Sequence, residues 1–109
     1  MIAQKSDLSS LMAFIGERYT FTQEHYPDLD ISSRAKQIFA VRHSALHMMK
    51  STGKIAAEAE SADHGGEMSA ENLKTATTKM LVNVLKLAEE LGISGDELAA
   101  NVPNVMASA

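Results

Sequence analysis

The stretch from Ile31 to Asp63 constrains the fold most strongly, because its apolar and small residues recur at the three-and-four spacing of one long α-helix. These residues form two rows: Ile38, Val41, Ala45, Met48, Thr52, Ile55 and Ala59 in the first, and Phe39, Leu46, Met49, Gly53 and Ala56 in the second. Two rows make a wide buried stripe, so the helix must pack against more than one neighbour. The sequence therefore predicts a central helix of about 30 residues, roughly 45 Å long.

A first helix is expected before this stretch, from about Asp7 to Tyr26. Ser6 is a suitable N-cap residue, and Pro27 ends the helix because the residue before a proline disfavours the α conformation. The linker that follows is short and acidic. Either Asp30 or Ser32 is expected to cap the long helix.

Two more helices are expected after the long one. Ser69 caps the third, which runs to Gly92, a residue type that commonly ends helices in the left-handed conformation. Ser94 and Glu97 form a Ser-x-x-Glu capping box, so a short fourth helix begins there. Pro103 lies inside this helix and removes a backbone hydrogen bond, so its last turns are expected to be irregular.

The connection between the long helix and the third helix contains His64-Gly65-Gly66. Because short connections favour antiparallel neighbours, these two helices are expected to pair through a Gly-Gly turn. The predicted fold class is an all-α four-helix bundle, as a single domain over residues 1–109. The two long helices carry more apolar surface than two short partners can cover, so a homodimer or higher homo-oligomer is expected.

The composition excludes several classes of protein and site. The chain has no cysteine, so it forms no disulfide, no thiolate zinc site and no cysteine nucleophile. A net charge of −4 argues against general nucleic-acid binding. The N-terminal residues lack the pattern of a signal peptide, and no apolar run reaches the roughly 18 residues of a membrane span. A cytoplasmic location without membrane association is therefore expected.

Two segments resemble the core hairpin of the MazG-like all-α NTP pyrophosphohydrolases: KSTGKIAAEAE at 50–60 and ENLKTATTKMLVNVLKLAEELGISGDEL at 71–98. The shared features are Gly53 followed by Ile55-Ala56, the small residues after them, and the run LAEELGIS, and the similarity covers about residues 40–100. In that family, carboxylates on two helices hold magnesium. The metal bridges the nucleotide phosphates and activates water for cleavage to the monophosphate and pyrophosphate.

The carboxylates that this family uses are missing from the matching positions. The family's acidic positions on the long helix fall on Lys50, Ser51 and Lys54, and those on the third helix fall near Ala76 and Lys79. Magnesium needs hard oxygen ligands and is repelled by lysine. The resemblance therefore implies a MazG-like scaffold without the metal-dependent catalytic centre and without a cofactor.

Residues 31–57 contain no Asp or Glu, but they contain five basic residues: Arg34, Lys36, Arg42, Lys50 and Lys54. Helical spacing gathers two sets of side chains on single faces, namely His43, His47, Lys50 and Lys54 on the long helix and Lys79, Asn83 and Lys86 on the third helix. If these faces oppose one another, they form a cationic cleft for phosphate or carboxylate groups that needs no metal. The predicted ligand-binding residues are His43, His47, Lys50, Lys54, Lys79 and Asn83, and the predicted ligand is a small nucleotide- or phosphate-like anion. The alternative is that the lysines form a solvated helix face.

Acidic residues crowd the end of the long helix and the connection after it: Glu58, Glu60, Asp63, Glu67 and Glu71. Glu60 and Asp63 are three residues apart, which puts both carboxylates on one side of a helix. If the resemblance extends to activity, the alternative magnesium ligands are Glu58, Glu60, Asp63 and Glu71. The chain is then an active magnesium-dependent nucleoside triphosphate pyrophosphohydrolase. The ordinary alternative is a solvated, acidic helix end.

Two further hypotheses remain open at this stage. His43 and His47 have the i, i+4 spacing that chelates zinc from one helix face. No third ligand accompanies them, so a structural or interface role is expected for both. The chain could also be a non-catalytic, oligomeric protein-interaction module, whose basic and acidic patches set the orientation of its partner. Whether the chain is an enzyme stays open.

Overall fold

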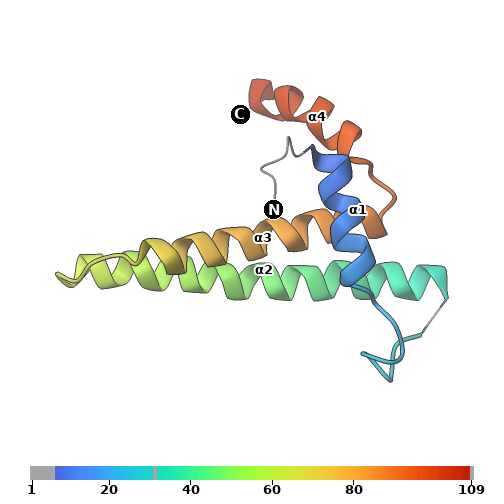
Figure 1. Cartoon of the computed structure of the whole chain (residues 1–109), viewed down its shortest axis with the longest axis horizontal. Helices are drawn as coiled ribbons and strands as arrows, with labels where there is room; N and C mark the ends of the chain where they lie inside the picture. The colour runs from blue at the N-terminus through green and yellow to red at the C-terminus, as the bar shows by residue number, and fades with distance from the viewer. Residues whose placement is uncertain (1–6, 31, 109) are drawn as a thin grey trace.

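The structure is a computed structural model that describes residues 7–30 and 32–108. Within these residues the chain forms four helices and no strand: α1 (Leu8–Arg18), α2 (Ser33–Asp63), α3 (Ala70–Glu90) and α4 (Gly95–Ser108). α2 and α3 lie side by side, and α1 and α4 lie near the end of this pair that is far from residues 64–69 (Figure 1). The predicted all-α fold class is confirmed.

The long helix α2 begins where the sequence provides caps. The hydroxyl oxygen of Ser32 accepts a hydrogen bond from the N–H of Ala35, at 3.4 Å, and the carboxylate of Asp30 accepts one from the N–H of Ser32, at 2.9 Å. The predicted start, Ile31, lies outside the described residues, whereas the end at Asp63 agrees with the prediction. Local capping therefore sets the start of this 31-residue helix.

Glycine terminates α2 and turns the chain toward α3. Gly65 has φ +87°, a left-handed conformation that side chains disfavour. The N–H of Gly66 donates to the carbonyl of Ser61, at 2.8 Å, which satisfies one of the last carbonyls of the helix. The hydroxyl oxygen of Ser69 then accepts from the N–H of Asn72, at 3.1 Å, and starts α3.

The buried side chains of α2 are small. Ala40 and Ser44 are fully buried and Ser51 is nearly so. Among the described helices, only α3 has its backbone close to α2, and Ala76 and Asn83 are buried on α3. Small residues allow the two helix axes to approach closely. The hydroxyl of Ser44 has no hydrogen-bond partner in the described part of the chain, so the pairing leaves one polar group unsatisfied.

Ser44→Ala is expected to stabilise the protein by about 1 kcal/mol, because it removes a buried hydroxyl that has no partner. Ser69→Ala makes the same chemical change at a helix N-cap and is expected to destabilise by about 1 kcal/mol. Urea unfolding of both variants measures the two free energies. If both substitutions changed the free energy of unfolding in the same direction, the explanation given for Ser44 would be contradicted.

The first helix is shorter than predicted. α1 ends at Arg18 and not at Tyr26, and its N-cap is Asp7, whose carboxylate accepts from the N–H of Ser10 at 2.7 Å. Ser6, the predicted cap, lies outside the described residues. Residues 19–30 form an irregular segment because their aromatic side chains are buried against α2, with Phe21 only 3% exposed. Tertiary burial outweighs the helical pattern here.

α1 packs against the C-terminal half of α3. Met12 and Ile15 of α1 form a buried cluster with Leu85 and Ala88 of α3. This cluster fixes α1 beside α3, and α4 contacts α1. Among the described residues, the core therefore lies at one end of the molecule, and α2 and α3 alone form the other end.

The capping box that starts α4 is confirmed. The hydroxyl oxygen of Ser94 accepts from the N–H of Glu97, at 3.1 Å, and the carboxylate of Glu97 accepts from the N–H of Ser94, at 3.0 Å. Gly92 has φ +75°, as expected for a glycine after a helix. The prediction of irregular last turns is wrong, because α4 continues through Pro103 to Ser108. Pro103 removes one backbone hydrogen bond without ending the helix, and residues 99–107 around it are exposed.

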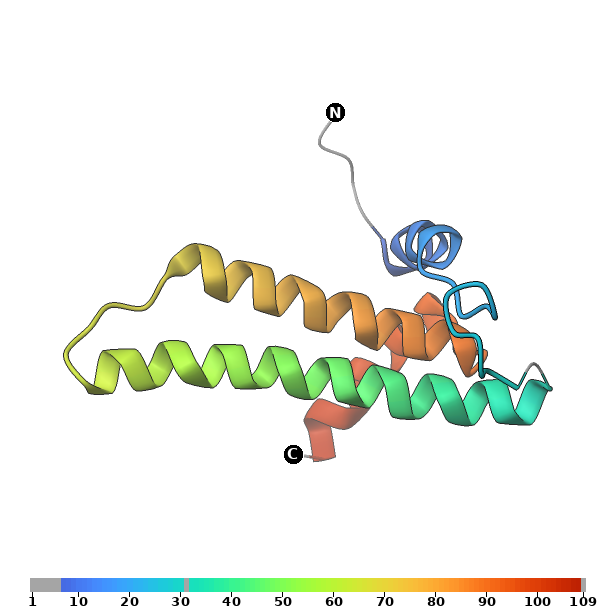
Figure 2. The same ribbon diagram turned by 90° about the horizontal axis from the view of Figure 1, so that it is seen from below.

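The molecule is extended for its length. Its radius of gyration is 16.4 Å, against about 13 Å for a compact chain of this size. Figure 2 shows α1 and the segment after it on one side of the α2–α3 pair, with the C-terminal end of α4 on the other. In the described part of the chain, no helix is long and apolar enough to cross a membrane.

Candidate anion-binding site

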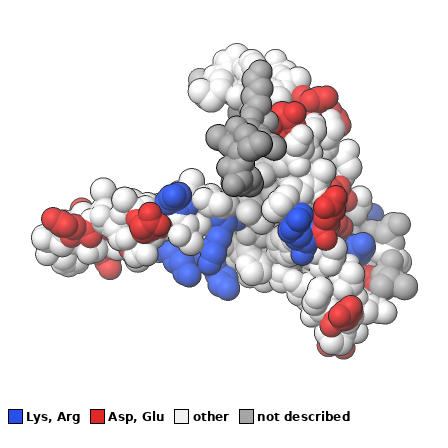
Figure 3. Space-filling view, viewed as in Figure 1, with Lys and Arg blue, Asp and Glu red and all other residues white. Residues whose placement is uncertain are grey.

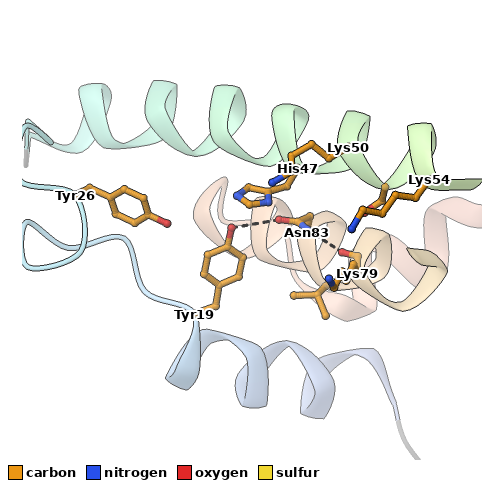
Figure 4. A pocket seen from close by; sticks show the side chains of 9 residues that line it. Tyr19, Tyr26, His47, Lys50, Lys54, Lys79 and Asn83 are labelled. Atoms are coloured by element: carbon orange, nitrogen blue, oxygen red, sulfur yellow. Dashed lines mark hydrogen bonds between the residues drawn. The ribbon is translucent and has the colours of Figure 1, made fainter. Parts of the chain in front are cut away.

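A cavity of about 370 Å³ lies between α2, α3 and the segment after α1 (Figure 4). The residues that line it are Tyr19, Tyr26, His47, Lys50, Ser51, Lys54, Lys79, Val82 and Asn83. Five of the six residues predicted to bind the ligand are among them, and they come from both helices. The sixth, His43, lies next to the cavity and contacts His47.

Three lysines give the cavity its charge. Lys50 and Lys54 come from α2, and Lys79 comes from α3. No Asp or Glu of the described residues lies within the 4.0 Å ion-pair distance of any of the three. Figure 3 shows basic side chains gathered midway along the α2–α3 pair and acidic ones toward its 64–69 end. The cavity is therefore a cationic site without an internal counter-ion.

Tyr19 and Asn83 form the fixed polar wall of the cavity. The hydroxyl of Tyr19 donates to Oδ1 of Asn83, at 3.2 Å, and Nδ2 of Asn83 donates to the carbonyl of Lys79, at 2.8 Å (Figure 4). Burial raises the pKa of Tyr19 above its ordinary value, and Tyr26 raises it further. Tyr19 therefore keeps its proton at neutral pH and serves as a donor, and Asn83 is held in one orientation.

Two histidines of α2, His43 and His47, contact each other beside this wall of the cavity. Nε2 of His43 lies 3.0 Å from Nε2 of His47 and 3.1 Å from the hydroxyl of Tyr26. The ring of Phe39 stacks on His43, with centroids 5.0 Å apart. Burial lowers the pKa of His43, and the neighbouring His47 and Lys50 lower it further. His43 therefore stays neutral near pH 7 and orients His47, which lines the cavity.

The lowered pKa of His43 predicts that stability falls as the solution is acidified. Below the ordinary histidine pKa of about 6.5, the unfolded chain takes up a proton that the folded His43 resists, so the free energy of unfolding decreases from pH 7.5 toward 5.5. His43→Gln should make this decrease smaller. Urea unfolding at several pH values measures it. The pKa values of Asp7 and Glu58 are also lowered, but the stability that these carboxylates contribute is lost only nearer pH 4, below the measured window. A wild-type stability that is flat across this window would contradict the prediction.

Lys86 does not line the cavity, although its spacing from Lys79 and Asn83 placed it on the same predicted face. Its side chain is only 2% exposed, and its ammonium group lies 2.9 Å from the carboxylate of Glu89 and 2.8 Å from that of Glu90. The prediction that Lys86 contributes to the cleft is wrong, because its side chain is buried and paired with two carboxylates on the next turn of α3.

The acidic residues of the alternative magnesium site are not gathered around one point. The carboxylate of Glu58 accepts from the N–H of Ser69, at 2.6 Å, and from Nδ2 of Asn72, at 3.0 Å, and these bonds lower its pKa. The other three, Glu60, Asp63 and Glu71, are exposed. Across residues 7–30 and 32–108, no three His, Asp or Glu side chains are grouped as a metal site. The residues present do not fit a magnesium ion.

Sequence reasoning missed four residues that line the cavity: Tyr19, Tyr26, Ser51 and Val82. Both tyrosines fall within the continuous first helix that the sequence predicts from about Asp7 to Tyr26. The signal that could have identified them is the run of aromatic and threonine residues at 19–26, whose helix propensity is low.

Comparison with known protein families, with curated proteins and with solved structures found no match to this chain. The resemblance to MazG-like pyrophosphohydrolases therefore stays a prediction. Inference about function rests on the cavity and its charges.

Proposed function

We propose that the cavity between α2 and α3 binds a small anionic ligand, nucleotide- or phosphate-like, without a metal ion. The observation that carries this proposal is the set of three lysines around one cavity with no carboxylate partner in the described residues. Like charges held around one cavity repel each other, and a bound anion relieves this repulsion. If the lysines formed only a solvated helix face, nothing would require Tyr19 and Asn83 to be held by hydrogen bonds beside them.

The lining supplies suitable donors for phosphate. Lysine ammonium groups bind phosphate oxygens as point charges with several donor hydrogens. The Tyr26 hydroxyl and the His47 ring offer further polar contacts at the same cavity. The volume of about 370 Å³ lies in the range of small-molecule sites.

The same lysines support the wider proposal of a MazG-like scaffold that binds its ligand without a metal centre and acts as a homo-oligomer in the cytoplasm. Lys50, Lys54 and Lys79 stand where that family would carry acidic residues. Positive side chains at these positions bind phosphate directly and take the place of the metal. The exposed apolar surface of the described helices supports association into an oligomer.

Thermal unfolding with and without millimolar ATP, in magnesium and in chelator, tests the proposal. A ligand at one hundred times its Kd stabilises the native state by about 2.7 kcal/mol. This corresponds to a rise in Tm of about 10 °C. A rise that persists in chelator supports the lysine site. A rise that requires magnesium would favour a working pyrophosphohydrolase, and no rise in either condition would favour a protein-interaction module.

A further inference from the structure

The C-terminal half of α4 presents an apolar face that no other part of residues 7–30 and 32–108 covers. Val102, Val105 and Met106 are 56%, 59% and 68% exposed, and every residue from 99 to 107 is exposed. Among the described helices, α4 contacts only α1. A 14-residue helix is marginal on its own, because most helical stability in proteins comes from packing of an apolar face. This half of α4 therefore requires a covering surface.

A second uncovered apolar face lies on the α2–α3 pair. Its residues are Ile38 and Val41 of α2, Leu81 and Val84 of α3, and Leu91 directly after α3, each between 39% and 46% exposed. Ile38, Val41 and Leu91 line one groove, which has a volume of about 260 Å³ and is bordered by Arg34 and Gln37. This face is thus apolar in its centre and polar at its border, as in protein–protein interfaces.

This face is on the opposite side of the α2–α3 pair from the anion site. Val41 and Lys50 are nine residues apart on α2, which places them roughly 180° apart around the helix axis. On α3, Val84 is separated by roughly 200° from Val82, which lines the cavity. Tyr19 and Tyr26 of the segment after α1 line the cavity, and the C-terminal end of α4 lies beyond α2 in the view of Figure 2. A partner can therefore cover this face without closing the cavity.

We propose that α4 of a second copy of this chain packs into this groove, and that the reciprocal contact forms at the same time. Charge favours this occupant, since α4 contains Asp96 and Glu97 and no basic residue, whereas the groove is bordered by Arg34 in the acid-free part of α2. A two-fold dimer covers both apolar faces of both chains, as an isologous interface requires. This contact rests on the homo-oligomer included in the proposed function and would be its interface.

Mass measurement in solution, by light scattering after gel filtration, tests this interface. The wild type should have twice the 11.7 kDa chain mass. Val105→Glu on α4 and Val41→Glu on α2 should each give monomers, whereas Met49→Glu, at a residue that is 68% exposed outside the groove, should remain a dimer. A wild-type monomer at high concentration, or a dimer that tolerates both substitutions, would overturn the proposal.

Cysteine cross-linking identifies the two faces that meet, because the natural chain has no cysteine. A mixture of a Val41→Cys chain and a Val105→Cys chain should give a covalent dimer under mild oxidation, and neither chain should do so alone. Cross-linking of the Val105→Cys chain to itself would mean that α4 pairs with α4, and would overturn the proposal. The result is independent of anion binding, because the cavity residues are unchanged in every variant.

Discussion

Lys86→Met is expected to lower the free energy of unfolding by about 3 kcal/mol. Lys86 is 2% exposed, contacts the carboxylates of Glu89 and Glu90, and lies 4.9 Å from the ring centre of Phe21. Removing one member of a buried ion pair costs roughly 3–5 kcal/mol, because the remaining charge is left without a partner. Glu90 is 14% exposed and Glu89 is 36% exposed, so water screens part of the loss and the lower end of this range applies. Urea unfolding at pH 7 measures it.

Two further variants separate the loss of charge from the loss of packing around Lys86. Adding Glu90→Gln to Lys86→Met should recover part of the stability, because the unpaired carboxylate is removed with its partner. Lys74→Met, at an exposed position on the same helix, should change the free energy of unfolding by less than about 0.5 kcal/mol. A loss below about 1 kcal/mol for Lys86→Met would mean that the two carboxylates do not depend on this lysine.

Lys54→Gln combined with Lys79→Gln is expected to weaken anion binding at least 100-fold. These two lysines line both the proposed anion-binding cavity and a neighbouring one of about 340 Å³, so they lie where the two spaces meet. Hydrogen bonds to charged groups contribute about 1.5–3 kcal/mol each. Two such contacts at the lower end of the range account for a factor of roughly 100 in Kd. The ATP-dependent rise in Tm, measured in chelator, should be lost in this double variant.

Arg42→Gln combined with Lys74→Gln is the matched control for this double variant. It also removes one positive charge from α2 and one from α3, but at exposed residues that do not line the cavity. It should keep the ATP-dependent rise in Tm. An equal loss in both double variants would show that the anion responds to overall charge and not to this cavity. Without ligand, both should unfold near the wild-type temperature, since exposed substitutions have small effects.

The helices that the sequence predicted well are those set by local signals. Each of these signals involves only a few neighbouring residues: Ser69 at the start of α3, the Ser94 and Glu97 capping box, and the glycine after α3. The two faces that form the cavity were also predictable, because helical spacing alone puts Lys50 and Lys54 together on α2. What the spacing could not show is that α3 lies against this face and not another.

The parts that sequence reasoning missed depend on contacts between distant residues. Tyr19 continues an apolar row of the first helix, yet α1 ends before it, because Phe21 and its aromatic neighbours are buried against α2. Lys86 has the spacing of a cleft residue, but its ammonium group lies 4.9 Å from the ring centre of Phe21 and 5.9 Å from that of Tyr19, contacts that helical spacing cannot show. In both cases burial in the tertiary structure outweighs a local pattern.

Calorimetric titration of the wild-type chain with ATP in chelator is the most direct test of the anion site. We expect saturable binding with one site per chain, and at least 100-fold weaker binding in the Lys54→Gln, Lys79→Gln variant. Because salt screens exposed charges, affinity should also fall as ionic strength rises. An absence of saturable binding, or unchanged binding in the double variant, would contradict the proposed function.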